Sequence, residues 1–85
     1  MQSIEGKIAW VAGAGTGIGR AGAVALARAG ATVILSGRRV PQLEAVAKQI
    51  TDAGGAAEIE PLDIVDVDAV NAAVGRIVDK HGRLD

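Results

Sequence analysis

Glycine occupies every second position from 13 to 19, within the segment AGAGTGIGR at residues 12–20. Spaced glycines between a strand and a helix let backbone N–H groups approach an anion, and the helix dipole adds to the attraction. Two spacings are present, GxxxGxG at Gly13, Gly17 and Gly19, and GxGxxG starting at Gly17 and ending at Gly22. The elements around the glycines decide which spacing is used.

The expected elements favour the first spacing. The apolar run at residues 7–12 predicts a strand buried on both faces, so the turn after it begins at Gly13. A small-residue helix is expected at residues 18–29, with Ile18 and Ala21 among the apolar residues near one face, and it would contain the last glycine of the GxGxxG spacing. The GxxxGxG spacing instead places Gly17 where the backbone approaches a pyrophosphate and Gly19 where the helix approaches the strand. The alternative is a glycine turn that packs the helix and binds nothing.

The rest of the chain continues the alternation of strand and helix. We expect a strand at residues 32–35, a helix from Pro41 to Gly54, a strand at residues 56–63 and a helix from Asp66 to Gly82. Alternating elements of this length imply an α/β fold with a parallel sheet, right-handed crossovers and helices on its faces. One domain, or part of one, accounts for all 85 residues.

Two arginines follow the second expected strand, in the sequence SGRR. Proteins of this architecture that use NAD usually place an acid there, about 20 residues after the glycines, to hold the ribose hydroxyls. Here Gly37 stands near that position, and a guanidinium beside it can bind a 2′-phosphate through a charge-assisted bond. The pattern favours NADP(H), with Arg38 as the first candidate ligand and Arg39 as the second. Two solvated loop charges are the alternative.

Asp63 ends the third expected strand and is a candidate acceptor for an adenine amino group, with the backbone of Ile64 beside it. A residue that only starts the following helix, next to Asp66, is an equally weighted interpretation. His81 lies on the apolar stripe of the last expected helix, where packing or interaction with the helix dipole is favoured over catalysis. Trp10 is expected in the core.

The composition argues against several other classes of protein. The formal net charge is −1, and neither Phe nor Tyr is present to stack on bases, so we expect no nucleic-acid partner. A single histidine and the absence of cysteine argue against a transition-metal site. The sequence shows neither a signal peptide pattern nor an apolar run of about 18 residues. We therefore expect a soluble, cytoplasmic protein with no membrane partner.

These motifs together resemble the short-chain dehydrogenase/reductase family over all 85 residues. AGAGTGIG is similar to the family's TGxxxGxG cofactor loop, and GATVILSGRR to the second strand of its NADP-preferring members. PLDI resembles the adenine-side aspartate with its apolar neighbour, and GRLD the run before the fourth strand. Two residues depart from the pattern, because Ala12 replaces the usual threonine and Gly15 a frequent serine, although Thr16 keeps a hydroxyl nearby.

The resemblance implies a Rossmann-like doubly wound sheet with strand order 3-2-1 and hydride transfer between a nicotinamide and a carbonyl or alcohol substrate. It implies NADP(H) rather than NAD(H), and a homo-oligomer, tetramer or dimer, in the intact protein. No residue here is implied to be catalytic, because the family's Ser, Tyr and Lys come later and this sequence has no Tyr. The implied cofactor-binding residues are Gly13, Gly15, Thr16, Gly17, Ile18, Gly19, Arg38, Arg39, Asp63 and Ile64.

A fourth strand would pair with the first, and without it residues 7–12 form an exposed apolar edge. We therefore expect this chain to be part of a longer protein rather than one whose edge is covered by a partner. Two other functions stay open, namely a non-catalytic NADP(H)-binding module and a truncated product without a function. A methyltransferase-like fold would require an acid after the second strand, and SGRR argues against it.

Overall fold

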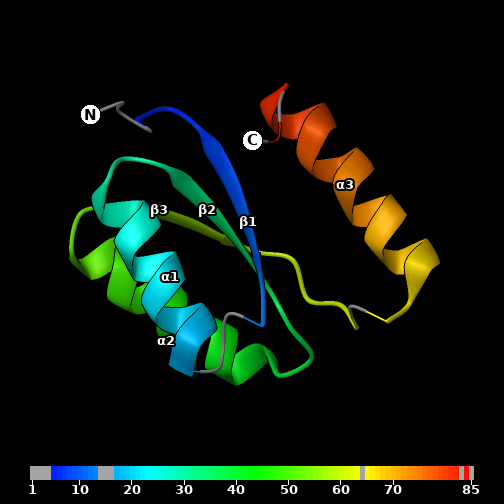
Figure 1. Ribbon diagram of the computed structural model, residues 1–85, viewed down its shortest axis with the longest axis horizontal. Coiled ribbons are helices and arrows are strands. Elements are labelled where there is room, and N and C mark those ends of the chain that lie inside the picture. Colours follow the sequence, from blue (N-terminus) through cyan, green and yellow to red (C-terminus); the bar gives the residue numbers. More distant parts are fainter. Residues whose placement is uncertain (1–4, 14–16, 64, 83, 85) are drawn as a thin grey trace.

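A three-stranded parallel sheet forms the centre of the molecule (Figure 1). The computed structural model describes residues 5–13, 17–63, 65–82 and 84. Its strands are β1 (Ile8–Ala12), β2 (Thr32–Ser36) and β3 (Ala56–Ile59). They lie in the order β1-β2-β3, which confirms the predicted order 3-2-1. The central strand, β2, is therefore hydrogen-bonded to β1 on one side and to β3 on the other.

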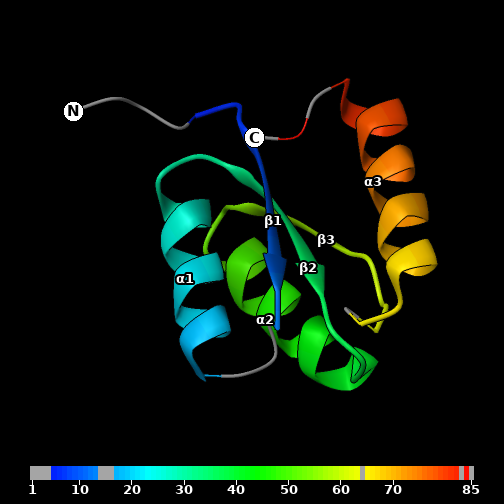
Figure 2. The same ribbon diagram turned by 45° about the vertical axis from the view of Figure 1, so that its right-hand side comes forward.

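Three helices alternate with the strands and flank the sheet on both sides. Helices α1 (Gly17–Arg28) and α2 (Val40–Asp52) lie together on one side, and α3 (Val67–His81) lies on the other (Figures 1 and 2). The predicted alternation and the Rossmann-like α/β fold class are thereby confirmed. All three junctions from strand to helix open at the same end of the sheet, because the strands are parallel.

The larger cluster of buried residues lies between the sheet and the pair α1 and α2. Val33 and Leu35 of β2 have no exposed surface and pack there against Leu43, Val46 and Ile50 of α2. The strand β1 is less buried than the sequence predicts, because it lies at an edge of the described sheet with a neighbour on one side only. The prediction of a strand buried on both faces is wrong for β1 and right for β2.

Alanines, not larger residues, bring α1 onto the sheet. Ala23 and Ala27, four positions apart, are its buried residues, whereas Ile18 is 92% exposed. The sequence predicts an apolar face that includes Ile18 and Ala21, and the structure shows both exposed. Small side chains at this spacing let the helix axis approach the sheet closely, so bulk is a poor guide to the buried face here.

Helix α3 begins and ends where its capping residues predict. The side chain of Asp66 accepts a hydrogen bond from the N–H of Ala69 at 3.1 Å, and Gly82 ends the helix with φ +75°. The buried residues of α3 are Ala73 and Ile77. Val67 and Val78, which the sequence predicts on the same apolar stripe, are 68% and 40% exposed, so that part of the prediction is wrong.

The third strand is shorter than predicted, although its pairing with β2 continues beyond it. Strand β3 ends at Ile59, and the expected range extends to residue 63. Beyond that end, the N–H of Glu60 donates to Leu35 and the N–H of Leu62 donates to Gly37. Pro61 lies between these two donors, where its missing N–H breaks no bond to β2. The chain therefore stays beside β2 as far as the pocket described below.

Ion pairs connect α3 to β3 and to the residue that follows it, on the side of the sheet opposite α1 and α2 (Figure 1). Arg76 pairs with Glu60, and the Lys80 ammonium lies 2.7 Å from a carboxylate oxygen of Glu58. His81 Nε2 lies 2.8 Å from the other carboxylate oxygen of Glu58, an ion pair when the imidazole is protonated. Burial alone would raise the pKa of Glu58, but the Lys80 hydrogen bond and the charges of His81 and Lys80 together lower it below its ordinary value of 4.5.

The Glu58→Gln substitution is expected to make the free energy of unfolding depend less on pH in the acidic range. A carboxyl whose pKa is lowered in the folded state stabilises the protein above its unfolded pKa, and this contribution disappears as pH falls through the folded pKa. We expect the variant to lose at most about 1 kcal/mol at pH 6, because the pairs are partly exposed, and to match the native protein near pH 3. Urea unfolding at both pH values measures this difference.

The matched control is Glu44→Gln. Glu44 is an exposed acid on α2 that has no ion-pair partner within residues 5–13, 17–63, 65–82 and 84. Its substitution is expected to leave the pH dependence of the unfolding free energy as in the native protein. Equal pH profiles for the two variants would show that the contacts of Glu58 contribute nothing to stability.

Candidate functional site

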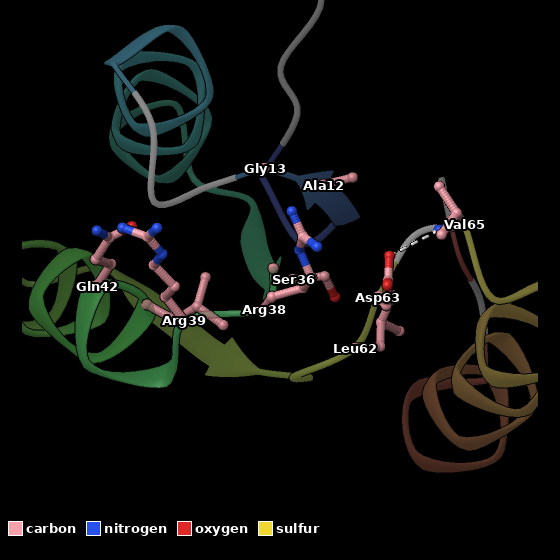
Figure 3. Close-up of a pocket in the computed structure, with 11 residues that line it drawn as sticks. Ala12, Gly13, Ser36, Arg38, Arg39, Gln42, Leu62, Asp63 and Val65 are labelled. Atoms are coloured by element: carbon pink, nitrogen blue, oxygen red, sulfur yellow. Dashed lines mark hydrogen bonds between the residues drawn. The ribbon is translucent and has the colours of Figure 1, made fainter.

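A pocket of about 610 Å³ opens at the carboxyl ends of the strands (Figure 3). In open parallel sheets, this is the edge where ligands bind. Each strand end supplies part of the lining. Ala12 and Gly13 come from the end of β1 and the turn after it, and Ser36 from the end of β2. Gly37, Arg38 and Arg39 come from the loop after β2, Gln42 and Leu43 from α2, and Leu62, Asp63 and Val65 from the segment after β3.

Gly13 forms the turn that leaves β1. Its φ of +70° lies in the left-handed region that favours glycine, and its N–H donates to the carbonyl oxygen of Ser36 at 2.9 Å. The sequence places the start of the turn at this residue, and the structure confirms that position. The turn therefore stays bonded to β2 while the chain crosses the pocket.

The N-terminal turn of α1 has room for a ligand next to the backbone. Gly17 is its first residue, and a Cβ atom built there would meet nothing within 4 Å. The first turn contains no acidic residue, so the helix dipole faces this space without a competing carboxylate. Gly22 lies inside the helix, as the rejection of the GxGxxG spacing requires. Ile18 and Gly19 belong to the same turn.

Not every predicted residue lies in the pocket. Gly13, Arg38, Arg39 and Asp63 line it, whereas the first turn of α1 is not part of its lining. The remaining predicted positions, Gly15, Thr16 and Ile64, are outside the described residues.

The two arginines of the SGRR sequence lie at the pocket and point in different directions. In Figure 3 the guanidinium of Arg38 lies beside Gly13, whereas the side chain of Arg39 extends toward Gln42. Both side chains are exposed, and neither has a hydrogen-bond or ion-pair partner in the part of the chain that the structure describes. Two positive charges without an ion-pair partner among the described residues therefore line the pocket, together with the carboxyl group of Asp63.

Asp63 has a structural role and keeps an acceptor available. Its Oδ1 accepts the N–H of Val65 at 3.1 Å, and its carbonyl oxygen accepts the N–H of Asp66 at 3.0 Å (Figure 3). These bonds form the turn that leads into α3, as predicted by the interpretation in which Asp63 starts the following helix. The second carboxylate oxygen, Oδ2, has no hydrogen-bond partner among the described residues and belongs to a residue that lines the pocket.

The sequence does not single out Ser36, which lies at the floor of the pocket. Ser36 is 1% exposed, accepts the Trp10 indole N–H at 2.6 Å and donates to the carbonyl oxygen of Glu60 at 2.7 Å. Trp10, expected in the core, is half-buried against Ile8, Ile34 and Ile77. The only signal in the sequence is a polar residue at the end of an otherwise apolar strand.

Other chemical classes of site find little support in the described residues. His81 sits in the last turn of α3 beside Glu58 and does not line the pocket. Within residues 5–13, 17–63, 65–82 and 84, no three His, Cys, Asp or Glu side chains are grouped to hold a metal ion. The helices in the same described segments are too short or too polar to cross a membrane.

The chain is similar to known dehydrogenases in sequence and in structure. A 3beta-hydroxysteroid dehydrogenase of Mediterraneibacter gnavus is 41% identical over 85 residues, which are 100% of this chain and 31% of that protein. A metagenomic short-chain oxidoreductase solved in complex with NADP has a TM-score of 0.95 and 42% identity, over 99% of this chain and 38% of that one. A hydroxysteroid dehydrogenase from Escherichia coli has a TM-score of 0.90 and 33% identity, over 96% and 34%.

The chain thus spans about a third of the length of these relatives. The family described as short chain dehydrogenase matches residues 7–85, nearly the whole sequence. The glycine turn, the strand order and the position of the pocket agree with this match. The chain belongs to the short-chain dehydrogenase family of oxidoreductases.

Proposed function

We propose that this chain is the NADP(H)-binding part of a short-chain oxidoreductase that transfers hydride between the nicotinamide and a carbonyl or alcohol substrate. The observation that carries the proposal is the Arg38 guanidinium, which lies beside the Gly13 turn without a partner among the described residues. No acid occupies the neighbouring position, because Gly37 stands there. This donor set suits a phosphate on the ribose better than a free hydroxyl.

The residues present fit a dinucleotide along its length. The open space at Gly17 and the acid-free first turn of α1 suit a pyrophosphate, and we assign Gly13 and Gly19 to the same site. We assign further contacts to the pyrophosphate from Gly15, Thr16 and Ile18. The similarity to a short-chain oxidoreductase solved in complex with NADP supports a nucleotide of this class as the ligand.

At the adenosine end, we assign Arg38, with help from Arg39, to the 2′-phosphate. Asp63 and the backbone of Ile64 are assigned to the adenine, because Oδ2 of Asp63 is available to accept an amino group. When bound, NADP(H) supplies or accepts the hydride. The chain's own residues bind and orient the nucleotide, and no side chain among the 85 residues is assigned to proton transfer.

Titration of the protein with NADPH and NADH tests the proposal. A charge-assisted bond to the 2′-phosphate contributes about 1.5–3 kcal/mol, so we expect NADPH to bind about 10- to 150-fold more tightly than NADH. Equal affinities would contradict the cofactor assignment, and the absence of binding to both would contradict the function. Saturable NADPH binding without turnover of any carbonyl or alcohol would favour a non-catalytic binding module.

The Gly37→Asp substitution is expected to reduce the preference for NADPH strongly. A Cβ at position 37 would lie 3.4 Å from Cδ2 of Leu43, so a small side chain fits with little adjustment. The new carboxylate would repel the 2′-phosphate and could accept the ribose hydroxyls of NADH. We expect NADPH affinity to fall by about tenfold or more, and the fall to shrink at high salt.

The control for this variant is Gly37→Ala, which adds the Cβ without the charge. Calorimetric titration at low and high ionic strength separates the two effects. If the alanine variant loses as much NADPH affinity as the aspartate variant, the loss is steric and the electrostatic argument is wrong.

A further inference from the structure

Ser36 connects the three segments that line the pocket. Its carbonyl oxygen accepts the N–H of Gly13, and its hydroxyl accepts the Trp10 indole N–H at 2.6 Å, so it is bonded twice to β1 and its turn. The same hydroxyl donates to the carbonyl oxygen of Glu60 at 2.7 Å, beyond the end of β3. At the carboxyl end of the described sheet, the Ser36 side chain therefore connects β1 on one side with the segment after β3 on the other.

The strand register makes this bridge possible. Trp10 is paired with Ile34, so its indole must reach diagonally along β2 to meet the hydroxyl two residues further on. Glu60 follows Ile59, the partner of Leu35, and thus comes opposite Ser36. The hydroxyl thus links Trp10 of β1 to the residue that follows β3, in a place where the Ser36 side chain is 1% exposed.

The hydrogen bonds from Trp10 to Ser36 and from Ser36 to Glu60 lie close in the chain to the groups assigned to the cofactor. Gly13 is bonded to the backbone of Ser36, and Arg38 is two residues beyond Ser36 in the chain. Beyond the third strand, Asp63 lies three positions after Glu60, and the N–H of Leu62 between them donates to the carbonyl oxygen of Gly37. A shift between the strand ends would change the spacing of all three contacts at once.

We propose that Ser36 is a positioning residue for dinucleotide binding, because its hydrogen bonds to Trp10 and Glu60 set the separation of the three strand ends that carry the pyrophosphate turn, the 2′-phosphate ligand and the adenine contact. The inference rests on the proposed function. Binding groups held in fixed relative positions need no reordering when the ligand arrives, and small displacements weaken several contacts together. Loss of the bridge therefore affects NADPH and NADH alike.

The test compares Ser36→Ala with Ser36→Thr. The alanine variant removes both hydrogen bonds, and we expect it to weaken NADPH and NADH equally, by about tenfold. The threonine variant keeps the hydroxyl in a residue type that strands favour and is expected to restore binding. The indole proton of Trp10, followed by NMR, is expected to exchange faster with solvent in the alanine variant only.

Two further variants keep the test decisive. Val46, on α2, is 2% exposed and does not line the pocket. The Val46→Ala substitution therefore removes buried volume and destabilises the fold, but it is expected to leave both dissociation constants unchanged. Trp10→Phe keeps an aromatic ring but loses the N–H donor and one of the two fused rings of the indole. It is expected to weaken both dinucleotides by about twofold to fivefold, and it replaces Ser36→Ala if that variant does not fold.

Three results would overturn the inference. The first is native affinity in Ser36→Ala although its indole proton has lost protection. The second is an equal loss of affinity in Val46→Ala, which would assign the effect to general destabilisation. The third is native affinity in Trp10→Phe where Ser36→Ala does not fold. A native protein that binds neither dinucleotide would overturn the proposed function together with the inference, whereas the three results above leave that function standing.

Discussion

The Gly17→Val substitution is expected to lower NADPH affinity by at least about 100-fold without disturbing the fold. A Cβ atom at Gly17 meets nothing within 4 Å among residues 5–13, 17–63, 65–82 and 84, so a side chain at this position is expected to leave the described fold intact. The added methyl groups would occupy the space next to the backbone at the start of α1, where a pyrophosphate would lie. Calorimetric titration with NADPH measures the loss, and circular dichroism checks that the helix content is native.

Gly22→Val provides a matched control within the same helix. A Cβ at Gly22 also meets nothing within 4 Å among the described residues, but this residue is exposed in the interior of α1, more than one turn away from the helix N-terminus. Native NADPH affinity is therefore expected, with a slightly more stable helix because valine has the higher helix propensity. If Gly22→Val weakens binding as much as Gly17→Val, the GxxxGxG assignment is wrong and the other glycine spacing must be reconsidered.

The Arg38→Ala substitution is expected to remove most of the preference for NADPH over NADH. The guanidinium lies at the pocket beside Gly13, and its assigned partner is the 2′-phosphate, which NADH lacks. We expect NADPH affinity to fall by about 10- to 150-fold, corresponding to about 1.5–3 kcal/mol, while NADH affinity stays within about twofold of native. Parallel titrations with the two dinucleotides give this ratio directly.

Arg39→Ala separates the two arginines. The side chain of Arg39 extends toward Gln42, so its removal is expected to cost less NADPH affinity than the removal of Arg38 (Figure 3). The Arg38→Lys variant keeps the charge but loses the planar fork and is expected to retain only part of the discrimination. Unchanged discrimination in Arg38→Ala would remove this residue from the site.

The sequence was sufficient for the elements and their order, because those depend on local signals. Gly13 ends β1 and Gly82 ends α3, both with positive φ, and Asp66 caps α3 through its side chain. Each of these residues satisfies a requirement of its own backbone, and such requirements can be seen in a single sequence. The parallel sheet then follows from the alternation of strands and helices.

The sequence was not sufficient where packing between distant segments decides. The buried face of α1 consists of Ala23 and Ala27, whose small size gives almost no hydrophobic pattern, so the larger Ile18 was wrongly expected on that face. The hydrogen bond from Trp10 to Ser36 depends on a diagonal across the register of two strands. No local propensity contains that information, which is why the floor of the pocket was missed.

The pocket is built from three successive junctions between strand and helix, and this has a thermodynamic consequence. A molecule that touches all three junctions binds the native chain and has no site on the denatured one. At a concentration about 100 times its dissociation constant, such a molecule would add about 2.7 kcal/mol to the unfolding free energy. The free energy of unfolding of a small domain is only about 5–15 kcal/mol in total. Under the proposed function, a higher dinucleotide concentration would therefore slow proteolysis of this chain.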